Sequence, residues 1–205
     1  MKIPFEKNRL LLVGIALFIN FGAAAMDKPG VNPLMKVSDF LRDTRDKKSI
    51  DYSQLSLLDI ERIITEVDGL LDPNQVAVRL RASQALQITP YNTWEYLQAI
   101  KRDLTEVARV RRMFYELLSK KNRGVAIGYE KISLKDLFKL QNEADILLRP
   151  GYDALLIAAG RRALVEPARV LEYLNAIKKD LSIAIEERIE VEHKSVQKRI
   201  VPISL

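Results

Sequence analysis

The sequence predicts an all-α fold, a helical bundle or a short solenoid built from two tandem three-helix repeats. The first observation is internal similarity: residues 50–111 align with residues 127–188 without a gap, a shift of 77 positions, and 22 of the 62 positions are identical. About four or five identities would arise by chance at average residue frequencies. The second observation is that apolar residues recur at spacings of three and four, prolines stand where helices would begin, and strand alternation is absent. Residues related by the shift of 77 positions are called equivalent below.

Residues 1–25 have the pattern of a secretory signal peptide. Lys2, Lys7 and Arg9 precede the apolar run of residues 10–19, and the small side chains of Ala23 and Ala25 suit cleavage before Met26. The run is short for a membrane span, which takes about 20 apolar residues. We therefore expect cleavage near Ala25 and a periplasmic or secreted bacterial protein, with an uncleaved anchor or a buried N-terminal helix as the alternatives.

Residues 26–49 form an N-terminal extension or a capping helix. Pro29, Gly30 and Pro33 begin the segment, and a short amphipathic pattern follows them. The apolar residues of this pattern are Leu34, Val37, Phe40 and Leu41. A helix with one apolar face could cover the otherwise exposed end of a repeat.

The first repeat, residues 50–119, contains three predicted helices. Ser56 and Asp59 resemble a capping box at the start of the first helix. Pro73 opens the second helix, which is expected to run to about Gln87, and Pro90 opens the third. Apolar spacing carries this third helix to Ser119, and residues 120–131 are then predicted to form a loop between the repeats.

The second repeat, residues 132–199, follows the same plan. Ser133 and Asp136 correspond to the first capping box, and Pro150 and Pro167 are equivalent to the two prolines of the first repeat. A charged stretch continues the last helix to residue 199, and residues 200–205 form a C-terminal tail that contains the helix-breaking Pro202.

The residue inventory does not favour catalysis, a metal or a cofactor. The chain has one histidine and no cysteine, so zinc and iron sites that depend on these ligands are disfavoured. No glycine-rich phosphate-binding loop is present. His193 lies in a charged stretch, and a solvent-exposed surface position is the simplest explanation for a histidine there. We expect a protein that is not an enzyme, that carries no cofactor, and that is stabilised by packing without disulfides.

The strongest internal match predicts a groove. Residues 95–104 read EYLQAIKRDL and residues 172–181 read EYLNAIKKDL. On a helix, the tyrosine and aspartate lie at one edge of the apolar face and the lysine at the other edge. The simpler interpretation is core packing with a polar rim. The functional interpretation is a groove between the repeats for a partner or ligand, lined by Trp94, Tyr96, Lys101, Asp103, Tyr173, Lys178 and Asp180.

A basic patch is predicted between the repeats, formed by Arg109, Arg111, Arg112, Lys120, Lys121 and Arg123. Such a helix could bind an acidic surface, lipid headgroups or an anionic envelope polymer. The alternative is a solvated helix face whose carboxylate partners lie elsewhere. Without residues 1–25 the chain has 30 basic and 26 acidic residues, a net charge of +4. This small charge and the predicted export argue against nucleic acid as a partner.

These features predict a non-enzymatic exported helical-repeat protein that serves as a protein–protein interaction or assembly module in the bacterial envelope. Its expected partner is another envelope protein, and peripheral contact with a membrane stays open. The alternative is a periplasmic sensor or carrier that holds a small molecule or a lipid between the two repeats.

Overall fold

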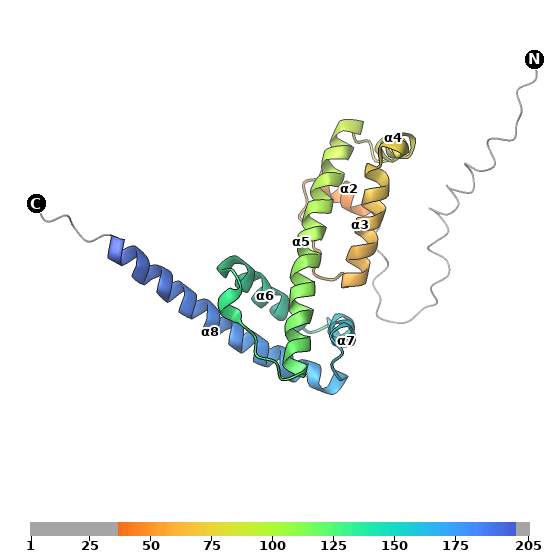
Figure 1. Ribbon diagram of the computed structural model, residues 1–205. Coiled ribbons are helices and arrows are strands. Elements are labelled where there is room, and N and C mark those ends of the chain that lie inside the picture. Colours follow the sequence, from red (N-terminus) through yellow and green to blue (C-terminus); the bar gives the residue numbers. More distant parts are fainter. Residues whose placement is uncertain (1–36, 200–205) are drawn as a thin grey trace, which may run out of the picture. The chain divides into compact units, whose positions relative to one another are not determined.

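Residues 37–199, the part of the chain that the computed structural model describes, contain seven α-helices and no strand (Figure 1). The predicted all-α fold is confirmed. The predicted signal peptide with its cleavage site near Ala25, the first part of the extension and the tail of residues 200–205 lie outside the described residues. No helix within the described part is long and apolar enough to cross a membrane.

The helices, in chain order, are α2 (Val37–Arg45), α3 (Leu57–Leu71), α4 (Val76–Ala85), α5 (Pro90–Asn122), α6 (Leu134–Leu147), α7 (Asp153–Arg162) and α8 (Pro167–Arg199). Two boundaries differ from expectation. The second predicted helix starts as a 3-10 turn at Pro73–Gln75 and its α-helical part ends at Ala85. The third runs through Asn122, so the connecting loop starts later than predicted.

Local hydrogen bonds explain where α3, α5 and α6 begin. The Ser56 hydroxyl accepts a hydrogen bond from the Asp59 amide at 3.1 Å, and the Asp59 carboxylate accepts one from the Ser56 amide at 3.0 Å. The Ser133 hydroxyl likewise accepts from the Asp136 amide at 3.1 Å. Thr89 caps α5 before Pro90, which occupies a first-turn position where proline is tolerated.

Left-handed residues explain where four of the helices end. Lys47 (φ 55°), Gln87 (φ 53°), Gly124 (φ 66°) and Leu164 (φ 57°) follow α2, α4, α5 and α7. A residue in this conformation turns the chain out of the helix. Gln87 and Leu164 are equivalent positions, and so are Lys47 and Gly124.

The long helix α5 connects the two halves of the described chain. Its N-terminal part packs against α2, α3 and α4, and its C-terminal part packs against α6, α7 and α8 (Figure 1). The buried apolar side chains from Val37 in α2 to Ile185 in α8 form one connected core. Because α5 contributes to both ends of this core, neither half has a separate interior.

The contact between α7 and α8 is unusually close at Gly160. A β-carbon at this position would lie 2.5 Å from Cγ2 of Val170. In the first half, α4 and α5 meet through Ser83, whose hydroxyl donates to that of Thr93 at 2.9 Å in a buried contact. Ser83 is equivalent to Gly160, and Thr93 to Val170. At these equivalent positions, a hydrogen-bonded serine–threonine pair lies between α4 and α5, and a closely packed glycine–valine pair lies between α7 and α8.

Gly160→Ala is expected to lower the free energy of unfolding by about 1–3 kcal/mol, because the added methyl group overpacks a stiff β-branched neighbour. Gly69 in α3 has no atom within 4 Å of a β-carbon position, so Gly69→Ala should instead stabilise the protein by about 0.5–1 kcal/mol through helix propensity. Urea denaturation followed by circular dichroism measures both changes. A stabilising Gly160→Ala would show that α7 and α8 do not approach this closely.

Candidate interaction site

A buried ion pair joins the two halves of the structure. Nε of Arg111 in α5 lies 2.8 Å from Oε1 of Glu143 in α6, and the two side chains are only 1% and 5% exposed. Nη2 of Arg111 also donates to the carbonyl oxygens of Tyr52 at 3.3 Å and Ser53 at 2.9 Å. One guanidinium therefore holds together α5, α6 and the segment before α3.

Burial raises the pKa of Glu143, and the charge and hydrogen bond of Arg111 oppose that rise. Removing a carboxylate from water is costly, and a nearby guanidinium compensates the cost only if the two groups keep good geometry. The contact is consequently sensitive to the relative position of α5 and α6.

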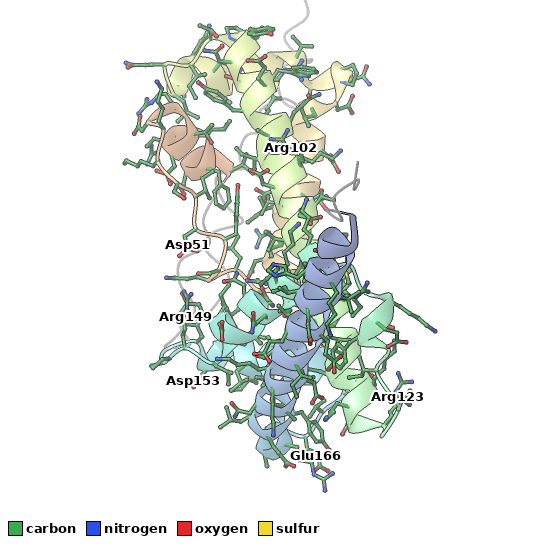
Figure 2. The ribbon with its side chains drawn as sticks, turned by 90° about the vertical axis from the view of Figure 1, so that its left-hand side faces the viewer. Asp51, Arg102, Arg123, Arg149, Asp153 and Glu166 are labelled. Atoms are coloured by element: carbon green, nitrogen blue, oxygen red, sulfur yellow. The ribbon has the colours of Figure 1, made fainter. Side chains whose placement is uncertain are left out.

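The segment before α3 makes further contacts across the same junction. The hydroxyl groups of Ser53 and Tyr152 are 3.0 Å apart and hydrogen-bonded. Hydrogen bonds from the side chain and amide of Ser53 lower the pKa of Asp51, and the charges of Arg149 and Arg111 act in the same direction. Figure 2 shows Asp51 and Arg149 on the same side of the molecule. These contacts fix the loop that precedes α3 against the residues that follow α6.

Arg188 in α8 is equivalent to Arg111 and makes a similar contact. Its Nη2 donates to the carbonyl oxygen of Glu130 and, at 3.2 Å, to that of Ile132, in the segment before α6. Among the described residues no carboxylate forms an ion pair with Arg188, whereas Arg111 is paired with Glu143. Arg188 is partly exposed.

An open hollow of about 560 Å³ lies beside Arg188, between α8 and the segment before α6. We call it the second hollow; its lining includes Ile127, Tyr129, Asp180, Ile183, Arg188 and Val191. The corresponding stretch of α5 is covered, since Val110, Arg111 and Phe114 are buried where α8 has Glu187, Arg188 and Val191. The difference arises because α6 and α8 pack on α5, while no described element follows α8.

A related hollow of about 510 Å³, the first hollow, lies between α5 and the segment before α3. Its lining includes Thr44, Lys48, Ile50, Tyr52, Ile100 and Asp103. Three of its members have equivalent residues in the second hollow, namely Ile50 with Ile127, Tyr52 with Tyr129, and Asp103 with Asp180. The two hollows therefore share a tyrosine, an isoleucine and an aspartate at equivalent positions, while their other lining residues differ.

Each hollow contains a tyrosine whose hydroxyl group is buried. Neither the Tyr52 hydroxyl nor the Tyr129 hydroxyl has a hydrogen-bond partner among the described residues. Burial raises the pKa of Tyr52 to about 12, with a further contribution from the charge of Asp103. Burial also raises the pKa of Tyr129, and Asp180 adds to the rise. Both hydroxyl groups are consequently protonated at neutral pH and can donate a hydrogen bond.

The residues predicted to line one groove occupy separate places. Nζ of Lys101 lies 2.6 Å from Asp68, and Nζ of Lys178 lies 2.6 Å from Asp145, so these lysines tie α5 to α3 and α8 to α6. Asp103 and Asp180 line the two hollows.

The aromatic members of that predicted set lie apart from the hollows. Tyr96 and Tyr173 are partly buried against the core, and the Tyr173 hydroxyl accepts from Arg169 at 3.3 Å. Trp94 is 41% exposed.

The residues of the predicted basic patch are mostly paired with carboxylates. The pairs are Arg109 with Glu106 and Asp136, Arg111 with Glu143, Arg112 with Glu61, Lys120 with Glu116, and Lys121 with Asp180. Arg123 donates to the carbonyl oxygen of Ser119. Arg111 belongs to the interior, so it is not part of a surface patch, and the pairs neutralise much of the charge of the others.

No family model, curated protein or solved structure matches this chain. Function is therefore inferred from the hollows and the buried ion pair. Sequence reasoning singled out Asp103 and Asp180 but missed Tyr129 and Arg188. Both are identical to their equivalent residues, at the two ends of the internal alignment, and that identity was the available signal.

Proposed function

We propose that the chain consists of two tandem helical repeats and acts as a non-enzymatic protein-interaction module, exported to the bacterial envelope. The repeat is supported by the helix bounds, since α4 and α7 begin and end at equivalent positions, as do α5 and α8. The ion pairs Lys101–Asp68 and Lys178–Asp145 occupy matching positions and have the same length of 2.6 Å.

Helix α2 supports a repeat larger than the predicted three helices. The positions equivalent to Val37–Arg45 are residues 114–122, the end of α5. The buried residues also correspond, because Val37, Phe40 and Leu41 of α2 fall on Phe114, Leu117 and Leu118. In this proposal α2 packs on the helices of the first repeat as the end of α5 packs on those of the second. Helix α2 therefore covers the outer end of the first repeat.

The observation that carries the interaction function is the second hollow. On α5, the surface around Arg111 is covered by the second repeat through Glu143. On α8, the matching surface around Arg188 is open to solvent and includes the exposed side chain of Val191. The equivalent surface of α5 packs against other helices, whereas this surface of α8 is uncovered. An uncovered surface of this kind is suited to binding another protein.

The composition of this surface favours a docking interface over the continuation of a repeat core. Val110 and Leu117 are buried on α5, and the matching residues of α8 are Glu187 and Lys194. Terminal repeats carry more polar outer faces than internal repeats. A half-polar surface with an apolar centre resembles a non-obligate interface.

The test is site-specific photo-crosslinking in the native cells. A photoreactive residue at Val191 is expected to give one discrete product of higher mass in the envelope fraction. The control is the same residue at Arg102, whose side chain is 79% exposed on α5 (Figure 2). Equal patterns at both positions, or no product at Val191, would contradict the interaction function. N-terminal sequencing of the recovered protein tests export, with Met26 expected as the first residue.

A small-molecule or lipid carrier is the second candidate, favoured by the hydroxyl groups of Tyr52 and Tyr129. Each is buried without a hydrogen-bond partner among the described residues, and a polar ligand that entered beside it could supply the acceptor. Native mass spectrometry of the protein taken from its own cells would reveal a constant added mass. Loss of that mass in a Tyr52→Phe, Tyr129→Phe variant would favour the carrier over the interaction module.

A further inference from the structure

We infer that the occupant of the second hollow is a second copy of this chain, docked through α8 in antiparallel orientation about a twofold axis. The inference rests on the proposed function of the second hollow as an interaction site and names its partner. It is carried by the pattern of charged and apolar residues along α8.

The residues of α8 that line the second hollow form one stripe. They are Asp180, Ile183, Ala184, Glu187, Arg188 and Val191, which follow one another at spacings of three and one. Such spacings place side chains on a single face of a helix. Ile183 is 45% exposed and Val191 is 63% exposed, so the apolar part of the stripe is accessible. Lys194 extends the stripe by three residues and is 67% exposed in its side chain.

The stripe is complementary to itself when it is reversed. A twofold axis between Glu187 and Arg188 places Glu187 of one copy opposite Arg188 of the other. The same axis places Ala184 opposite Val191, Ile183 one residue away from Val191, and Asp180 one residue away from Lys194. The two central charges then meet opposite charges, and the apolar residues lie next to each other. Asp180 and Lys194 also pair with Lys121 and Glu190 inside the chain, so the central pairs carry the complementarity. A parallel arrangement would instead oppose like charges at the centre.

The junction inside the protein provides the precedent for this contact. There, Arg111 holds the carbonyl oxygens of the segment before α3 and receives a carboxylate from the element that packs on it, Glu143 of α6. Arg188 holds the carbonyl oxygens of the segment before α6 in the same manner. Glu187 of the second copy would supply the missing carboxylate. An isologous contact of this kind closes on itself as a dimer and does not propagate.

The experiment is a charge-exchange series followed by sedimentation equilibrium of the purified protein at low salt. The protein is expected to dimerise with a dissociation constant on the order of 1–100 μM, typical of small half-polar interfaces. Arg188→Glu places four acidic residues around the axis, and Glu187→Arg places four basic residues there. Each variant alone is expected to dimerise at least ~10-fold more weakly.

An equimolar mixture of the two variants is the decisive sample. Arg188→Glu has glutamate at both central positions and Glu187→Arg has arginine at both, so an antiparallel heterodimer regains two opposite-charge contacts. The mixture should associate more tightly than either variant by itself. Arg102→Glu serves as the control for a surface charge change and should leave dimerisation unchanged.

Three outcomes would overturn the inference: a protein that stays monomeric to about 300 μM, well above the expected dissociation constant, variants that dimerise as well as the unaltered chain, or a mixture that does not restore association. If the protein is monomeric and the probe at Val191 still captures a different protein, the second copy is the wrong partner and the interaction function stands. If the protein dimerises and the probe at Val191 gives no product, the inferred α8 contact is wrong.

Discussion

Arg111→Met is expected to lower the free energy of unfolding by about 3–5 kcal/mol, because it leaves the Glu143 carboxylate buried without its partner. The side chains are 1% and 5% exposed, so water cannot replace the guanidinium without opening the junction. The carbonyl oxygen of Ser53 loses its donor at the same time. Methionine has a similar length and is apolar, so the loss reflects charge and hydrogen bonding more than volume.

Two further variants distinguish a buried charge effect from a general effect of removing arginine. Arg112 lies on the same helix, is 57% exposed in its side chain and pairs with Glu61 at the surface, so Arg112→Met should cost at most about 1 kcal/mol. Arg111→Met combined with Glu143→Met should recover most of the loss, because no buried charge remains. Urea denaturation measures all three. Similar losses for Arg111→Met and Arg112→Met would refute the buried junction.

The loss caused by Arg111→Met should depend on pH. Burial raises the pKa of Glu143 in the folded protein, and without Arg111 this rise is unopposed. A folded-state pKa above the unfolded value costs stability at higher pH. This cost declines as the pH falls below the folded-state pKa and is absent below the unfolded-state pKa. The difference in unfolding free energy between the variant and the unaltered protein should therefore be smaller at about pH 5 than at about pH 8. A difference that grows toward acid would contradict the assignment.

Phe40→Ala is expected to lower the free energy of unfolding by about 3–5 kcal/mol, the cost of truncating a fully buried aromatic side chain. Phe40 in α2 is 0% exposed, and its ring centroid lies 5.6 Å from that of Tyr52. The segment predicted as an extension or capping helix thus contributes to the main core. Removal of α2 would expose the faces of α5 and α3 on which this helix packs.

Phe138→Ala provides the matched control for this truncation. Phe138 lies in α6 and is 47% exposed, so the same change should cost less than about 1.5 kcal/mol. Thermal and urea unfolding followed by circular dichroism give the comparison. If the two substitutions destabilise the protein equally, α2 is not part of the core.

The helices of this protein could be predicted from local sequence because their ends depend on nearby residues. Ser56, Thr89 and Ser133 cap helices through bonds to amides three residues away, and Pro90 and Pro167 stand at helix starts. The position of Lys101 at the opposite edge from Asp103 also follows from helical geometry alone. These interactions span a few residues, so a single sequence contains the information they require.

The role of α2 could not be predicted in the same way. Of its buried residues, only Leu41 is identical to its equivalent residue, since Val37 and Phe40 correspond to Phe114 and Leu117. Burial in a core requires apolar character and suitable volume, not a particular side chain. The correspondence that we propose between α2 and the end of α5 therefore rests on the matching burial of these positions and not on residue identity.

The sequence by itself determined the all-α class, the positions of most helix ends and the pairs of equivalent residues. Only the tertiary structure decided that Arg111 is buried against Glu143 and that the matching Arg188 stands beside an open hollow. The physical reason is that burial depends on what packs against a helix. The second half of the chain covers α5, no described element covers the corresponding part of α8, and two similar arginines consequently occupy an interior and a surface.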